Sequence, residues 1–195
     1  MKGRLLAISG SPHKNGATGE MLDYAMRIAE QHGYVVDYIN LYEKNIAYCK
    51  GCRACIQLHN CVVKDDIQEI ATLLKECNII ILAAPVYWAN VPAIVKNMFD
   101  RLLGVMMEET RTFPKPRLSN KQKYVLFTAC NTPAPFSILF GQSTGAIRGM
   151  REVFKTSGMK YGGSCVWTGN NKTVFPKYIE RKIEKLFEKQ TKKGR

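Results

Sequence analysis

The sequence lacks the segments that would carry a chain into or across a membrane. Its 195 residues begin with a basic stretch, but the apolar run behind it, 5–8, is too short for a secretory signal. The longest apolar stretch, 78–95, is interrupted by Pro85, Asn90 and Pro92, so it makes a poor membrane span. These absences predict a cytoplasmic protein that has no membrane partner.

Acidic residues are also scarce. The chain has 16 Asp and Glu against 29 Lys and Arg, which gives a formal net charge of +13. A charge of this sign can attract nucleic acid, an anionic membrane surface or small anionic ligands. Much of it lies in 172–195, where apolar residues recur at helical spacing, as in an amphipathic helix with a solvated basic face. Because no nucleic-acid-binding module accompanies the charge, we expect no nucleic-acid partner.

The composition is otherwise that of an ordinary globular protein. Hydrophobic residues make up 46% and charged residues 23% of the chain, and we find no internal repeat, low-complexity tract or linker. A chain of this length buries a core without disulfides or metal staples. We therefore expect a single domain that spans residues 1–195.

Short apolar runs alternate with segments of helical period, which is typical of a parallel sheet covered by helices. The third of the predicted strands is apolar on both faces, so we place it at the centre of the sheet. The predicted strands are 5–8, 34–39, 78–83, 124–128 and 165–167.

Helical patterns fill the gaps between these strands. Asp66 and Glu69 form a candidate capping box for a helix, and Pro92 can begin another. The pattern predicts an α/β, flavodoxin-like, doubly wound sheet of five parallel strands with helices on both faces. In such folds ligands bind beyond the carboxyl ends of the strands, so we expect the active site in the loops after residues 9, 40, 84 and 129. Segment 104–122 is predicted as a long irregular connection, of the kind that is often functional or interfacial.

A loop rich in Ser, Thr and Gly follows the first predicted strand and precedes a helix. Hydroxyl groups and free backbone N–H groups at a helix N-terminus suit a phosphate monoester, and the helix dipole adds a favourable field. The loop lacks the Gly-Lys-Ser/Thr of a Walker motif and is not a Gly-x-Gly-x-x-Gly dinucleotide loop. The alternative is an ordinary turn with a helix cap. The candidate phosphate ligands are Ser9, Ser11, Asn15, Gly16, Ala17 and Thr18.

This loop, 10–18, resembles the phosphate-binding loop of the flavodoxin-like NAD(P)H-dependent FMN reductase family. A second segment typical of that family, 84–92, follows the third predicted strand, and 96–101 continues it. The resemblance implies bound FMN, a flavin-dependent oxidoreductase, and a ring-binding turn whose aromatic residues contact the isoalloxazine. His13 stands where the family often has Arg, and Lys14 can compensate. The implied ring-binding residues are Pro85, Val86, Tyr87, Trp88 and Asn90.

A third loop, 128–135, occupies the remaining position that faces the flavin in the family. It departs from the family's Gly-rich pattern, so no binding residue is assigned there. The aromatic residues Tyr87 and Trp88 also have a plainer interpretation, as core or interface side chains.

Seven cysteines in a chain predicted to be cytoplasmic argue against a disulfide framework. Four of them lie within thirteen residues, close enough for their thiolates to surround one metal centre. Soft sulfur ligands leave an iron–sulfur cluster or zinc, or thiols that are structural or redox-reactive. Zinc sites more often pair two Cys-x2-Cys units across a longer gap. The candidate ligands are Cys49, Cys52, Cys55 and Cys61, whereas Cys77, Cys130 and Cys165 are expected to be buried.

The spacing of these four cysteines resembles that of the iron–sulfur flavoproteins, a branch of the same family in which a [4Fe-4S] cluster passes electrons to FMN. This resemblance implies an electron donor, ferredoxin or NAD(P)H, and a small-molecule or protein acceptor. It also implies a homodimer or homotetramer, in which Trp88 and the 106–107 segment could contact a second copy. No side chain is assigned a catalytic role, because the chemistry resides in the cofactors.

Two other functions remain open. The first is a cluster-free NAD(P)H-dependent FMN or quinone reductase, in which the cysteines are incidental. The second is a basic, non-enzymatic binding module that keeps the fold without turnover.

Overall fold

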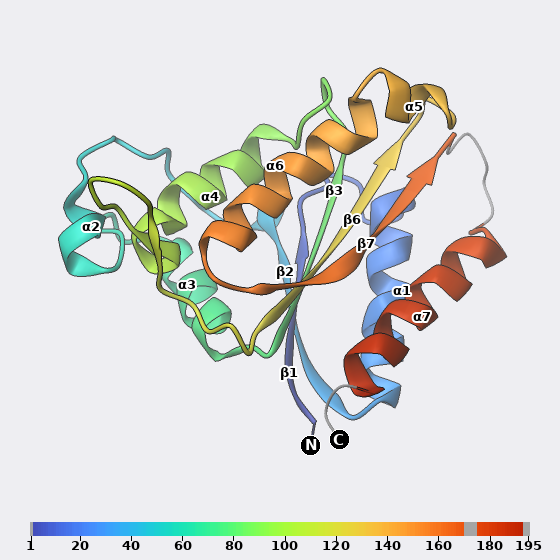
Figure 1. The fold of residues 1–195 in the computed structure, drawn as a ribbon, viewed down its shortest axis with the longest axis horizontal. Coiled ribbons are helices and arrows are strands. Elements are labelled where there is room, and N and C mark those ends of the chain that lie inside the picture. Colours follow the sequence, from blue (N-terminus) through green and yellow to red (C-terminus); the bar gives the residue numbers. More distant parts are fainter. Residues whose placement is uncertain (1, 170–174, 193–195) are drawn as a thin grey trace.

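The computed structural model describes residues 2–169 and 175–192, and its centre is one parallel β-sheet. The strand order is β2-β1-β3-β6-β7, so β3 has a neighbour on each side, as its apolar sequence predicted (Figure 1). All four pairings in this sheet are parallel. The strands are β1 (Gly3–Ser9), β2 (Tyr34–Asn40), β3 (Ile79–Pro85), β6 (Lys123–Cys130) and β7 (Lys160–Thr168).

Helices cover both faces of the sheet (Figure 1). One layer holds α1 (Ala17–Gln31) and α7 (Lys177–Lys192), and the other holds α3 (Ile67–Glu76), α4 (Ala93–Met106) and α6 (Gln142–Thr156). Each layer has its own hydrophobic core, because alternate side chains of the strands point to opposite faces. This arrangement confirms the predicted flavodoxin-like fold. Within the described residues, no helix is long and apolar enough to cross a membrane.

The last strand is longer than its sequence predicted. It runs from Lys160, whereas the apolar signal covers only 165–167, because the segment before it contains Gly162 and Gly163. The register against β6 shifts at this point, between Tyr124 and Val125. An extra residue in one strand is a β-bulge, which glycine accommodates and which hides the strand from a pattern of alternating apolar residues.

The predicted capping box of α3 is wrong by one residue. Asp66 is the N-cap residue but its side chain makes no cap hydrogen bond, and Asp65 instead accepts a hydrogen bond from the Ile67 amide at 3.1 Å. Gln68 returns the bond by accepting from the Asp65 amide at 2.9 Å. Because two aspartates are consecutive, the sequence is compatible with a capping box that begins at either one. Asp66 is used elsewhere, because its carboxylate accepts from the Asn45 amide at 2.7 Å.

Segment 104–122 is more regular than expected. Helix α4 continues to Met106, and a short hairpin follows, in which β4 (Met107–Glu108) pairs with β5 (Lys115–Pro116). Met106 is buried in the core, so it is not available for the subunit contact suggested by the sequence. The remaining short elements are η1 (Leu41–Glu43), α2 (Ala54–Leu58) and α5 (Phe136–Leu139).

The C-terminal end of α4 lies against α2, the helix inside the cysteine loop. Arg117, which follows the hairpin, donates to the carbonyl of Gly104 at 2.7 Å and to that of Ile56 in α2 at 3.0 Å. A methyl group on Gly104 would lie 2.1 Å from the Cys55 carbonyl oxygen. Such a contact is far inside van der Waals distance, so α2 can approach α4 this closely only where α4 has a glycine.

We therefore predict that Gly104→Ala destabilises the protein by about 1–3 kcal/mol, the usual effect of overpacking, because α2 must move away. The matched control is Gly149→Ala in α6, where the new methyl group would meet a single neighbouring atom at an ordinary 3.5 Å. Replacing a helical glycine by alanine should there be neutral or stabilising by up to about 1 kcal/mol. Urea unfolding of both variants checks this, and equal effects would contradict the proposed close approach.

Candidate functional site

A cleft of about 380 Å³ lies at the carboxyl ends of the central strands. Three of the four predicted loops line it, those after β1, β3 and β6, whereas the loop after β2 does not. Its size is that of a pocket for a small organic ligand. The lining residues are His13, Gly16, Ala17, Thr18, Pro85, Val86, Tyr87, Trp88, Ala89, Ala129, Cys130, Asn131, Thr132 and Gln142.

One wall of the cleft is the N-terminus of α1. Gly16 caps this helix without a side-chain hydrogen bond, so the amides of 17–19 are directed out of the first turn and are free to bind an anion. The loop folds tightly over this turn, because a methyl group on Gly19 would lie 1.8 Å from the Lys14 carbonyl oxygen. Gly16, Ala17 and Thr18 line the cleft, and their binding of a phosphate stays a prediction.

The other predicted phosphate ligands shape the loop and do not line the cleft. The Ser11 hydroxyl accepts from the His13 amide at 3.2 Å and donates to the His13 carbonyl at 3.3 Å. Ser9 is buried and hydrogen-bonds Tyr38. Asn15 lines a separate, shallow pocket formed by residues 12–16. Ser11 thus helps to hold the shape of the loop that presents the helix N-terminus.

Of His13 and Lys14, only His13 lines the cleft. Lys14 does not line the cleft, because its ammonium group pairs with the Glu43 carboxylate at 2.6 Å. The hydrogen bond with Glu43 raises the pKa of Lys14. His13 does line the cleft, so it is His13 that stands beside the anion site.

The opposite wall is the turn that follows β3. Tyr87 and Asn90 exchange backbone hydrogen bonds of 2.8 and 2.9 Å, and the two residues between them have left-handed backbone angles, with φ of 52° at Trp88 and 59° at Ala89. Residues other than glycine avoid this region, and strained backbone gathers at functional sites. Asn90 closes the turn and does not line the cleft; its side chain accepts from the Val91 amide at 2.8 Å. The Trp88 side chain is fully exposed.

The third wall is the loop after β6, which the sequence placed at the site without assigning binding residues to it. Residues 129–132 and Gln142 line the cleft, and the Cys130 thiol lies 3.5 Å from the Gln142 amide oxygen. The predicted burial of Cys130 is confirmed. The parallel register pairs Ala129 with Pro85, so the loop after β6 lies beside the loop after β3 and reaches the cleft.

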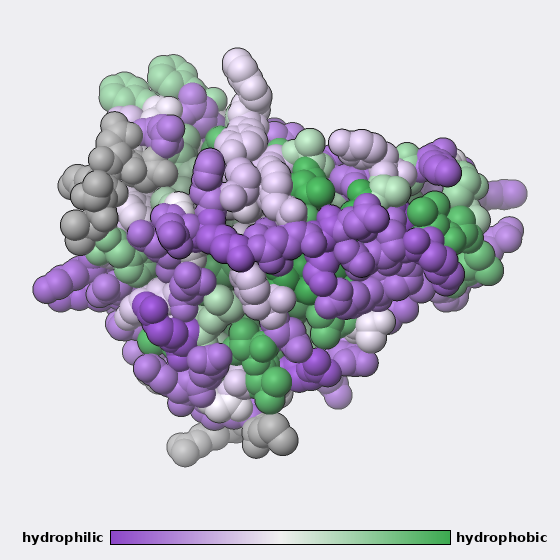
Figure 2. Space-filling view, turned by 180° about the vertical axis from the view of Figure 1, so that it is seen from behind, coloured by the Kyte–Doolittle hydropathy of each residue, from purple (hydrophilic) through white to green (hydrophobic). Residues whose placement is uncertain are grey.

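Apolar side chains are exposed around the mouth of the cleft. Figure 2 shows green, hydrophobic side chains at the upper edge of the molecule, where α5 lies in Figure 1. Exposed apolar clusters of this kind commonly mark contact surfaces. The residues are Phe136, Ile138, Leu139 and Phe140 of α5, together with Tyr87 and Trp88 of the turn.

The four clustered cysteines lie in a separate loop, 48–62, beside α4. Cys49 and Cys52 are exposed, whereas Cys55 and Cys61 are half-buried, and all four are free thiols. Burial raises the pKa of Cys55, and the three other thiols of the loop raise it further. A hydrogen bond with the Gly104 backbone lowers it by less. Within the described part of the chain, however, no three Cys, His, Asp or Glu side chains are grouped to hold a metal ion. The loop therefore provides the right ligand type in an open arrangement.

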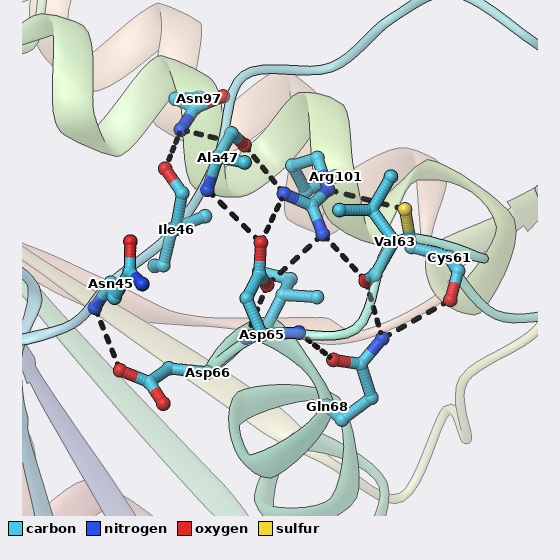
Figure 3. A network of polar contacts seen from close by, with 11 residues as sticks. Asn45, Ile46, Ala47, Cys61, Val63, Asp65, Asp66, Gln68, Asn97 and Arg101 are labelled. Carbon is cyan, nitrogen blue, oxygen red and sulfur yellow. Dashed lines mark hydrogen bonds and ion pairs between the residues drawn. The ribbon is translucent and has the colours of Figure 1, made fainter.

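A buried ion pair closes the base of this loop (Figure 3). The Arg101 side chain is fully buried and the Asp65 side chain is 8% exposed; their nearest atoms are 2.8 Å apart. Burial alone would raise the pKa of Asp65, but hydrogen bonds from Arg101 and from the amides of Ala47 and Ile67 outweigh it and hold that pKa below its usual value. A network of this kind is costly to break.

Comparison with known proteins finds similarity over most of the chain. A family model described as "NADPH-dependent FMN reductase" matches residues 3–171. An iron-sulfur flavoprotein of Archaeoglobus fulgidus is 40% identical over 100 residues, which are 51% of this chain and 46% of that protein. The chain thus spans about half the length of such relatives.

Two further similarities extend over nearly the whole chain. An iron-sulfur flavoprotein of Clostridioides difficile is 28% identical over 95% of this chain and 76% of its own. The structure of an FMN-dependent NADH-azoreductase from Bacillus anthracis, in complex with FMN, superposes with a TM-score of 0.72 at 12% identity, covering 98% of this chain and 99% of that one. The latter likeness supports the fold alone.

We predict that Asp65→Asn lowers the free energy of unfolding at pH 7 by about 3–5 kcal/mol, because it leaves the Arg101 charge buried without its partner. The pKa of Asp65 is depressed in the folded state, so its stabilisation is present above the unfolded value of about 3.9 and is lost as the pH falls through the folded value. The difference between wild type and variant should therefore shrink in acid. Urea unfolding from pH 7 to pH 3 tests this against Asp66→Asn, and similar losses in both variants would contradict it.

Proposed function

This chain belongs to the NADPH-dependent FMN reductase family, and from this premise we propose that it is a flavin-dependent oxidoreductase with FMN in the cleft at the carboxyl ends of β1, β3 and β6. The observation that carries the proposal is the pairing of two walls. A helix N-terminus without a side-chain cap faces a strained turn that bears aromatic side chains. FMN has a phosphate at one end and a planar ring at the other, so its two ends match the two walls.

The residues of the chain would bind and orient the cofactor. The amides of 17–19 and the Thr18 hydroxyl are suited to the phosphate, with His13 beside them. Tyr87 and the backbone of 129–132 border the space left for the ring. Bound FMN supplies hydride and electron transfer, and we infer NAD(P)H as a donor from the family. We assign no catalytic acid or base to this chain.

We further propose that the cysteine loop holds a [4Fe-4S] cluster, which supplies one-electron transfer when bound. Support comes from four free thiols in one loop and from relatives named iron-sulfur flavoproteins. Four thiolates are the usual ligands of such a cluster. Because the loop is open, binding requires its exposed end, with Cys49 and Cys52, to close toward Cys61. With a cluster, ferredoxin becomes a second candidate donor.

A cluster-free NAD(P)H-dependent FMN or quinone reductase is the alternative. The open arrangement of the four cysteines favours it. In that case the thiols are structural or redox-reactive, and the flavin takes its electrons from NAD(P)H alone.

We propose that a second copy of the chain covers the exposed aromatic turn and α5, as a homodimer or within a homotetramer. Large apolar side chains stand exposed there, at the mouth of the cleft. Burying them between subunits would also shield the flavin from water. Light scattering of the flavin-loaded protein decides this, since a fully loaded monomer would exclude it.

We predict that Thr18→Val weakens FMN binding about tenfold or more, since a hydrogen bond to a charged group contributes about 1.5–3 kcal/mol. The variant keeps the size and branching of the side chain. Thr72→Val is the control, because Thr72 lies on the exposed surface of α3, where it hydrogen-bonds the Gln68 carbonyl. Fluorescence titration measures the FMN affinity of both variants. Equal affinities would mean that the Thr18 hydroxyl does not bind the phosphate.

For the cysteine loop, we predict about four iron and four sulfide per chain after anaerobic reconstitution. Cys52→Ala should lose both, whereas Cys165→Ala, in the core on the other face of the sheet, should keep them. Flavin absorption should be present in all three proteins. A wild type with flavin and no iron would establish the cluster-free alternative.

A further inference from the structure

One of the four clustered cysteines is bound to the rest of the fold in a way that sets it apart. We propose that Arg101 is a positioning residue for the cysteine loop, which fixes Cys61 as the pre-set ligand and keeps an N–H···S hydrogen bond to it when the loop is loaded. The inference rests on the proposed function, because it concerns the loop that would hold the cluster. It also adds a specific role to the 96–101 segment.

A single guanidinium group ties together both ends of the loop (Figure 3). Nη1 donates to the Ala47 carbonyl, just before the loop begins, and Nη2 donates at 2.9 Å to the Val63 carbonyl, just after it ends. Both Nη atoms also bind the Asp65 carboxylate. The remaining donor, Nε–H, is directed at the Cys61 sulfur, 3.1 Å away. All five N–H groups of the side chain are thereby used.

The position of Arg101 is set by α4. Asn97 lies one turn before it on the same helix face and donates to the Ile46 carbonyl at 3.1 Å, so two residues of α4 hold the segment that leads into the loop. The Arg101 side chain has no exposed surface in which to move. Cys61 therefore lies against a fixed donor, whereas Cys49 and Cys52 are exposed to solvent. When the loop binds a cluster, Cys61 would already be in position, and the exposed cysteines would move toward it.

Arginine suits this position in a way that lysine does not. A planar guanidinium directs five donors in fixed directions, and an ammonium group is a compact charge with three. A charged N–H donor to a ligating sulfur also stabilises the more negative, reduced state of an iron–sulfur centre, and so makes its reduction potential more positive. Arg101 would thus have an electronic effect that a merely structural residue lacks.

Arg117 provides the matched control. It also fastens the cysteine loop, through the carbonyls of Ile56 in α2 and Gly104 in α4, but it binds no sulfur. Arg101→Lys and Arg117→Lys both remove hydrogen bonds to the loop and conserve charge. Of the two, Arg101→Lys alone removes a donor to a cysteine.

The first test uses the metal-free protein, so it does not depend on the cluster. Proton–nitrogen NMR resolves a buried arginine Nε–H, which Arg101→Lys assigns. Cys61→Ala should shift this signal and speed its exchange with solvent, while Cys49→Ala leaves it in place. An Arg101 signal that is indifferent to Cys61→Ala would overturn the assignment.

The second test uses the reconstituted protein and reads the reduction potential of the cluster. Arg101→Lys should make it more negative than in wild type, and Arg117→Lys should leave it unchanged. Equal potentials in the three proteins, or equal shifts in both variants, would contradict the electronic role. If wild type takes up no iron, the proposed cluster fails and the tuning of its potential fails with it. The NMR result then decides by itself whether Arg101 holds Cys61.

Discussion

All five strands of the main sheet run parallel, so their carboxyl ends share one edge, and the ligand-binding loops must lie beyond it. β3 occupies the centre and is covered by helices on both faces, which makes its carboxyl end the middle of that edge. The phosphate loop comes from β1 on one side and the 129–132 loop from β6 on the other. The cleft is therefore a consequence of strand order, and its chemistry is a consequence of what those three loops contain.

Helix α4 connects this edge to the cysteine loop. It begins at Ala93, directly after the strained turn, and Arg101 follows about 12 Å further along the axis at the usual rise per residue. Asn97, Arg101 and Gly104 recur at helical spacing on the face that meets the cysteine loop. One helix thus begins next to the turn and contacts Cys55 and Cys61 further along, so it links the two candidate sites physically.

The fold and two walls of the cleft could be predicted because their signals are local. The loop that ends in Gly16 to Thr18 directly follows the first strand, and the aromatic turn directly follows the central one. Arg101 was visible only as part of a motif, because its partners Asp65 and Cys61 lie 36 and 40 residues away. The capping box was misplaced because two aspartates stand side by side. The roles of Ser11 and Asn90 depend on hydrogen bonds within their turns, which residue type alone does not reveal.

The central claim is that the α1 N-terminus holds the phosphate of FMN, and comparing the affinities of FMN and riboflavin tests it most directly. The two ligands share the isoalloxazine ring and differ only in the phosphate. Titration of flavin-free protein should show FMN binding at least tenfold more tightly, with the difference reduced at high salt, where charge interactions are screened. Equal affinities for the two flavins would mean that this loop holds no phosphate, and would contradict the account.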